Sequence, residues 1–131
     1  MPNDAKISGK KPDLTHRVTQ AAETALAGKK FVSSVDVLIG LGWLTDAHLD
    51  QWKRGRVDYL ERVVNANLNK ITSAMKAFHV WARVMGRKPS ETKYVAHTRD
   101  RHLLRFSKSG APEIERRYRT HYLSSDPATF T

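Results

Sequence analysis

Hydrophobic and polar positions follow a helical period through the first two-thirds of the chain. Between residues 13 and 28, apolar side chains recur three or four positions apart, which predicts an amphipathic helix with Asp13 as its N-cap. Ser33 and Asp36 have the spacing of a capping box and predict a second, short helix. Thr45 is placed to cap a third helix. Together these patterns predict an N-terminal helical bundle.

A longer apolar stripe follows these short helices. From Leu60 to Met85, large apolar residues again fall three or four positions apart without interruption. This spacing predicts one long central helix that opens near Val57, and Gly86 and Pro89 are expected to end it.

After this stripe the pattern changes to that of β-strands. Short runs with β-branched and aromatic residues lie on both sides of a polar turn at residues 99–101, which predicts a β-hairpin. The tightest register pairs His97 with His102 and Val95 with Leu104. Because side chains alternate along a strand, all four are then expected on one face.

Pro112 suits the first turn of a closing helix. The side chains predicted to line its inner face are Ile114, Tyr118 and Tyr122. Glu115 precedes Arg119 by four positions, which is the favourable orientation for an ion pair on a helix surface. We therefore expect a stable, exposed helix that adds positive potential.

With 131 residues, the chain has the size of one domain with a substantial core. We predict an α+β, mainly helical fold: an N-terminal helical bundle with one long central helix, then a C-terminal β-hairpin and closing helix. The expected divisions are a flexible basic arm (1–12), a globular domain (13–124, helical over 13–86 and hairpin plus helix over 87–124) and a tail (125–131).

Composition excludes several classes of protein. The chain has no cysteine, which rules out disulfides, thiolate zinc sites and a cysteine nucleophile. Its start lacks the apolar stretch of a signal peptide, and the apolar run from Val37 to Leu44 is too short to span a bilayer. We therefore expect a cytoplasmic protein without a membrane partner. No histidine pair has the helical spacing of a metal site, so neither metal nor cofactor is predicted.

The strongest functional signal is the net charge of +10. Residues 87–131 contain ten Lys/Arg and five Asp/Glu, whereas residues 31–59 contain three and four. A basic surface of this kind attracts polyanions, which favours a DNA- or RNA-binding protein acting through contacts with the phosphate backbone. The candidate contact residues are Arg99, Arg101, Arg105, Arg116, Lys53, Arg54, Arg56, Lys10 and Lys11.

The mode of nucleic-acid binding stays open at this stage, both for the type of nucleic acid and for single or double strands. The helices around residues 40–45 are helix-turn-helix-like, but Asp46 and Asp50 lie where phosphates would approach, which favours a packed helical corner. Most aromatic residues fall on apolar faces and are expected in the core, namely Trp43, Trp52, Trp81, Tyr118 and Tyr122. Phe31, beside two lysines, has a freer position.

Two other classes of function remain as alternatives. A histidine pair, His97 and His102, with arginines nearby could supply the acid, base and cations of a small metal-independent nuclease or toxin-like enzyme. Half-buried packing residues are the simpler interpretation of that pair, so the sequence favours a binding protein over an enzyme. The third hypothesis is a basic adaptor that binds an acidic protein partner.

Overall fold

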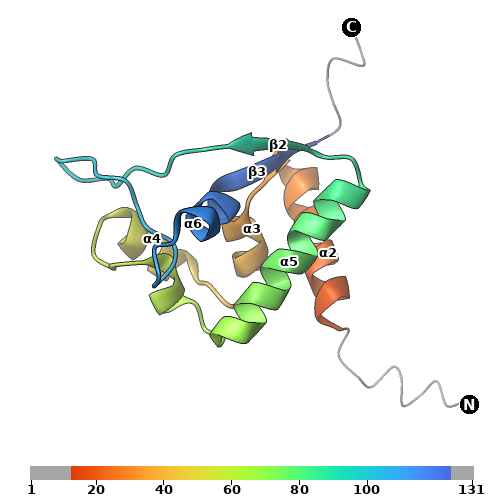
Figure 1. The fold of residues 1–131 in the computed structure, drawn as a ribbon, viewed down its shortest axis with the longest axis horizontal. Helices are drawn as coiled ribbons and strands as arrows, with labels where there is room; N and C mark the ends of the chain where they lie inside the picture. Colours follow the sequence, from red (N-terminus) through yellow and green to blue (C-terminus); the bar gives the residue numbers. More distant parts are fainter. Residues whose placement is uncertain (1–12, 125–131) are drawn as a thin grey trace, which may run out of the picture.

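The computed structural model describes residues 13–124, which form five α-helices and a three-stranded antiparallel sheet (Figure 1). The predicted α+β, mainly helical fold class is therefore confirmed. The predicted arm at residues 1–12, with Lys10 and Lys11, and the predicted tail at residues 125–131 lie outside the described residues. The division of the chain into arm, domain and tail stays a prediction.

The first helices begin where the sequence predicts. They are α2 (Leu14–Gly28), α3 (Ser34–Gly40) and α4 (Asp46–Lys53). The Asp13 carboxylate accepts a hydrogen bond from the His16 amide at 2.8 Å, and Thr45 caps α4 in the same way. Ser33 and Asp36 form the complete, reciprocal capping box. All three N-caps are thus confirmed, and each satisfies backbone donors that the first turn of a helix leaves unpaired.

The predicted long helix is shorter than its apolar stripe. Its first part is a 3₁₀ turn, η1 (Leu60–Val63), after which Val64 is extended. The helix α5 (Leu68–Val84) starts only at Asn67, whose side chain accepts from the amide of Lys70. An asparagine stabilises a new helix start better than a helix interior. The stripe runs through this break because Leu60 and Val64 reach the same core from a non-helical segment.

The sheet joins distant parts of the chain. Its strands are β1 (Phe31–Val32), β2 (Lys88–Glu91) and β3 (Thr120–Leu123), in the order β1-β3-β2. In this antiparallel sheet Val32 pairs with Tyr122, which in turn pairs with Pro89. The sheet therefore joins the segments that follow α2 and α5 to the C-terminal end of the described chain.

The closing helix α6 (Pro112–Arg119) starts at the predicted proline but ends earlier than predicted. Thr120 begins β3 instead, and its hydroxyl bonds the carbonyl of Arg116 at 2.9 Å. Tyr122 therefore belongs to a strand and not to the helix face. Because β3 pairs with two strands at once, these ladders outweigh the helical spacing of three side chains.

The predicted hairpin is present only as a single bridge, and its register is wrong by one residue. Val95 pairs with Leu103, not with Leu104. Val95 is consequently exposed, while Ala96 and Leu104 are buried. A shift of one position moves every side chain to the opposite face. The core selects the register that buries Ala96 and Leu104.

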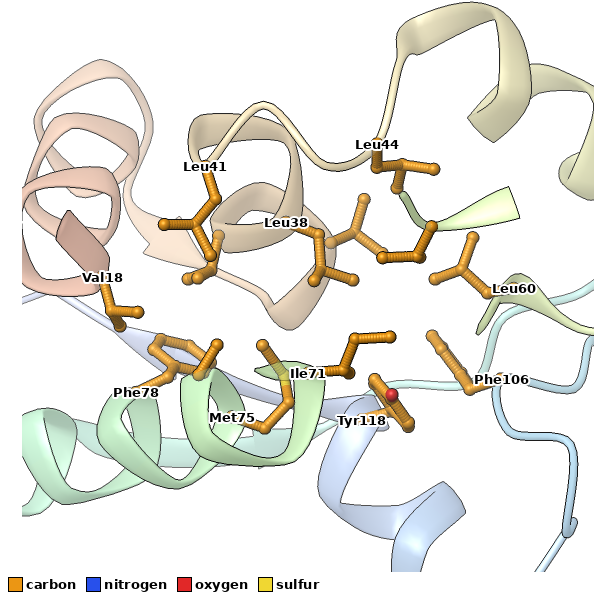
Figure 2. Packing of buried hydrophobic residues seen from close by; sticks show 14 of the residues in the cluster. Val18, Leu38, Leu41, Leu44, Leu60, Ile71, Met75, Phe78, Phe106 and Tyr118 are labelled. Atoms are coloured by element: carbon orange, nitrogen blue, oxygen red, sulfur yellow. The ribbon is translucent and has the colours of Figure 1, made fainter. Parts of the chain in front are cut away.

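Large side chains from most elements fill the core (Figure 2). Trp52, Phe78 and Phe106 are fully buried. Trp81 and Tyr118 are also buried, which confirms the assignment of these aromatic residues to the core. The other two predicted core aromatics, Trp43 and Tyr122, are partly buried against it.

Glu115 does not form the predicted ion pair with Arg119. Its carboxylate is buried and accepts from the amides of Phe106 and Ser107 at 2.9 and 2.7 Å, and from the Ser107 hydroxyl at 2.6 Å. A buried carboxylate needs such donors because burial removes its hydration. Glu115 thereby links α6 to Phe106 and Ser107, which follow the bridge in the sequence.

Candidate functional site

Residues 97–102, which we call the tip loop, project from the body of the protein (Figure 1). The base of this loop lies on the C-terminal end of α4. The His97 amide donates to the Lys53 carbonyl at 2.6 Å. A Cβ atom added at Gly55 would lie 3.1 Å from the Thr98 methyl group and 3.4 Å from the His102 ring. Gly55 also has a positive φ of 76°, so glycine permits both this turn and the close approach.

This contact brings together two groups of cations that are far apart in the sequence. We call them the basic end; its members are Lys53, Arg54, Arg56, Arg99 and Arg101. Within residues 13–124, the only ion pair that involves any of them joins Arg54 to Asp50 at 2.8 Å. The other four cations have no carboxylate partner in this part of the chain and are available to an anion.

Asp100 lies between Arg99 and Arg101 in the sequence, and its carboxylate forms local hydrogen bonds. Its carboxylate accepts from the Thr98 hydroxyl at 2.6 Å and bonds His102 Nδ1 at 3.0 Å. These bonds, with that of Thr98 first, lower the pKa of Asp100 to about 2. Asp100 therefore shapes the tip loop while it remains ionised.

Arg101 has a positive φ of 49°. A left-handed backbone is unfavourable for a residue with a long side chain, whereas glycine or asparagine adopts it readily. The Arg101 amide closes the turn by donating to the Thr98 carbonyl at 3.2 Å. Such a residue in a strained turn is a typical feature of functional loops.

Arg105 and Arg116, two other predicted contacts, have protein partners. The Arg105 guanidinium donates to the carbonyls of Ser107 and Lys108 at 2.8 and 2.7 Å and lies over the Tyr59 ring. Arg116 forms an ion pair with Glu91 at 3.3 Å. Their role in nucleic-acid binding stays a prediction, and we do not include them in the basic end.

The predicted pairing of His97 with His102 is wrong. In the observed register, the Ala96 amide donates to the His102 carbonyl at 2.8 Å, so His102 lies opposite Ala96. His102 bonds Asp100, whereas His97 lines a cleft on the other side of the loop base. The nuclease hypothesis that uses His97 and His102 stays a prediction.

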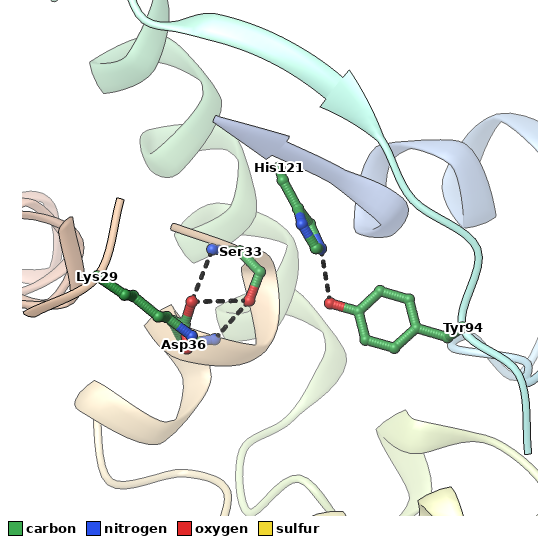
Figure 3. A network of polar contacts seen from close by, with 5 residues as sticks. All are labelled: Lys29, Ser33, Asp36, Tyr94 and His121. Carbon is green, nitrogen blue, oxygen red and sulfur yellow. Dashed lines mark hydrogen bonds and ion pairs between the residues drawn. The ribbon is translucent and has the colours of Figure 1, made fainter. Parts of the chain in front are cut away.

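That cleft has a volume of about 370 Å³ and lies between α3, α4 and the segment that follows β2. Its chemically important lining residues are Lys29, Phe31, Lys53, Tyr94, His97 and His121. The network on its wall is shown in Figure 3. The Tyr94 hydroxyl and His121 Nε2 form a hydrogen bond of 2.8 Å, and the His121 ring stacks on the ring of Phe31.

Burial controls the charge of this wall. It raises the pKa of Tyr94 to about 12 and lowers the pKa of His121. Both side chains are therefore uncharged at neutral pH. Asp36 is the acid of the cleft, but it accepts from the amide and hydroxyl of Ser33 and pairs with Lys29 at 2.7 Å. The lysines thus determine the sign of the potential in the cleft.

Sequence reasoning missed most of this cleft. Phe31 was the aromatic residue with the freer position, and it does line the cleft. His121 was assigned to the closing helix. The threonine, histidine and tyrosine at the start of the run Thr120–Leu123 have the composition of a strand, and that signal would have separated His121 from the helix.

None of the helices in residues 13–124 combines the length and apolar character needed to cross a bilayer. In the same residues, no three side chains of histidine, aspartate or glutamate converge as a set of metal ligands. Comparison of the chain with protein-family models, with curated proteins and with solved structures gave no match.

Proposed function

We propose that the protein binds nucleic acid through phosphate contacts at the basic end. The observation that carries this proposal is the anchoring of the tip loop on α4, which brings Arg99 and Arg101 to the same end of the molecule as Lys53 and Arg56. Separated cations attract phosphates weakly, whereas a cluster of cations follows the backbone of a polyanion.

The expected strength of the salt dependence follows from the number of available cations. Four of the five have no carboxylate partner in the described chain, and each phosphate contact contributes about −0.9 to the slope of log affinity against log salt on duplex DNA. Four contacts give a slope of about −3.6, which lowers the affinity about 150-fold between 50 and 200 mM salt.

Fluorescence anisotropy with a labelled duplex, a single-stranded DNA and an RNA of the same sequence tests the proposal. We expect binding at low salt and a linear, steep dependence on salt. A salt-independent affinity, or no binding at low salt, would refute it. Polyglutamate is the control for general attraction of anions. If it competes as well as nucleic acid at equal charge, the protein is instead an adaptor for an acidic partner.

A further inference from the structure

The polar cleft and the basic end are continuous. Lys53 belongs to both, because its backbone carbonyl accepts a hydrogen bond from the tip loop and the residue also lines the cleft. His97 also lies at their junction. A strand whose phosphates follow the basic end therefore passes the mouth of this cleft.

The charges of the cleft suit a phosphate group. Lys29, Lys53 and Lys93 line it, and Asp36 is the only acidic residue that lines it within residues 13–124. Because Asp36 already accepts from Ser33 and pairs with Lys29, its charge is largely balanced within the protein. Lys53 and Lys93 form no ion pair with any residue in the described chain, so they leave a positive potential at the mouth.

The rest of the lining suits a flat, partly polar ring. Leu49, Val95 and Leu104 supply apolar contacts, while Tyr94 and His121 line the cleft with their hydroxyl and Nε2 bonded to each other. More than half of the lining residues are polar or charged, and a volume of about 370 Å³ lies at the lower end of the range of sites for small ligands. Such a space accommodates one nucleotide, and a base reaches it only when it is unpaired and unstacked.

We propose that this cleft accepts one unpaired nucleotide of a strand whose backbone is bound at the basic end. The base lies between Leu49 and Val95, and its phosphate lies near Lys53 and Lys93. This inference rests on the proposed function and extends it, because it makes single-stranded nucleic acid the preferred ligand.

Filling the cleft separates this inference from the general attraction of phosphates. Val95 lines the cleft and is 37% exposed, so Val95→Trp obstructs the space without disturbing the core. Its bridge partner Leu103 is 61% exposed and lies outside the cleft, which makes Leu103→Trp the matched control. Thermal melting of both full-length variants verifies that they are folded.

In anisotropy measurements with a single strand and its duplex, Val95→Trp is expected to weaken single-strand binding about tenfold or more, as when one base loses its contacts. Duplex affinity should change less than twofold, and Leu103→Trp should change neither. An equal effect of Val95→Trp on both ligands, or on neither, overturns the cleft proposal while duplex binding still supports the basic end. Absence of all nucleic-acid binding overturns both proposals.

A second measurement uses small probes. Adenosine 5′-monophosphate should shift the amide resonances of Tyr94 and His121 in NMR spectra and compete with the single strand. Inorganic phosphate should shift those near Lys53 and Lys93 but leave that of His121 unchanged. If the mononucleotide leaves the resonances of Tyr94 and His121 unchanged, the cleft does not hold a base and the inference is wrong.

Discussion

Neutralising the two arginines of the tip loop is the most direct perturbation of the basic end. Arg99→Gln with Arg101→Gly removes two cations that have no ion-pair partner among the described residues. Two lost phosphate contacts should make the salt slope on duplex DNA shallower by about 1.8 units. The loss of affinity between 50 and 200 mM salt should then be about twelvefold smaller in the double variant than in the parent protein.

The glycine at position 101 keeps this experiment free of a folding defect. Arg101 has a φ of 49°, a conformation that costs an L-residue about 1–2 kcal/mol and glycine nothing. Glycine in turn costs about 0.5–1 kcal/mol in unfolded-state entropy. These opposing terms nearly cancel, so the melting temperature should stay within a few degrees of that of the parent protein.

Two further double variants supply the comparison. Lys53→Gln with Arg54→Gln should change the slope by only about 0.9, because Arg54 already pairs with Asp50 at 2.8 Å. Lys70→Gln with Lys76→Gln removes the same charge from α5, away from the tip loop in Figure 1, and should leave the slope unchanged. A larger effect at Lys53 and Arg54 than at the tip loop would move the interface to the helical corner. A larger effect on α5 would refute the basic end altogether.

Stability measurements test the interior. Phe78→Ala should lower the free energy of unfolding in urea by about 3–5 kcal/mol, because Phe78 is fully buried; an unchanged midpoint would contradict its place in the core. Glu115→Ala should cost about 2–5 kcal/mol by leaving the buried amides of Phe106 and Ser107 without an acceptor, and a loss below 1 kcal/mol would show that water replaces the carboxylate. Burial lowers the pKa of His79 to about 4, so the unfolded chain takes up this proton first as pH falls below about 6.5. Stability should therefore fall by about 2 kcal/mol between pH 7 and pH 5 in chemical denaturation, and the fall should shrink in His79→Gln.

The sequence correctly predicted structural features that depend only on residues close together in the chain. The N-caps at Asp13, Ser33 and Thr45 are correct because a cap is defined within one helical turn. The long central helix was predicted too long because periodicity reports which side chains reach the core, not whether the backbone between them is helical. Asn67 was the signal of the break.

Pairings between distant segments were not predictable in the same way. β3 depends on β1 and β2, which are remote in the sequence, so a helical spacing of Tyr118 and Tyr122 gave the wrong element for Tyr122. The predicted register of the hairpin is wrong because the burial of Ala96 and Leu104 determines which residues pair. That register also determines the candidate site, since it separates His97 from His102 and directs only His97 toward the cleft.

In this chain, a charged side chain that already bonds other protein groups has a structural role. A charged side chain without such bonds is available to a ligand. Glu115 and Arg105 are charged side chains, as are the residues of the basic end, yet each is held by hydrogen bonds to backbone groups. Rebinding such a group to a ligand would first break bonds that stabilise the fold. Arg99 and Arg101 have no comparable bonds from their guanidinium groups within residues 13–124, so a phosphate that binds them displaces only water and counterions. A polyanion can therefore bind the tip loop without breaking hydrogen bonds that stabilise the fold.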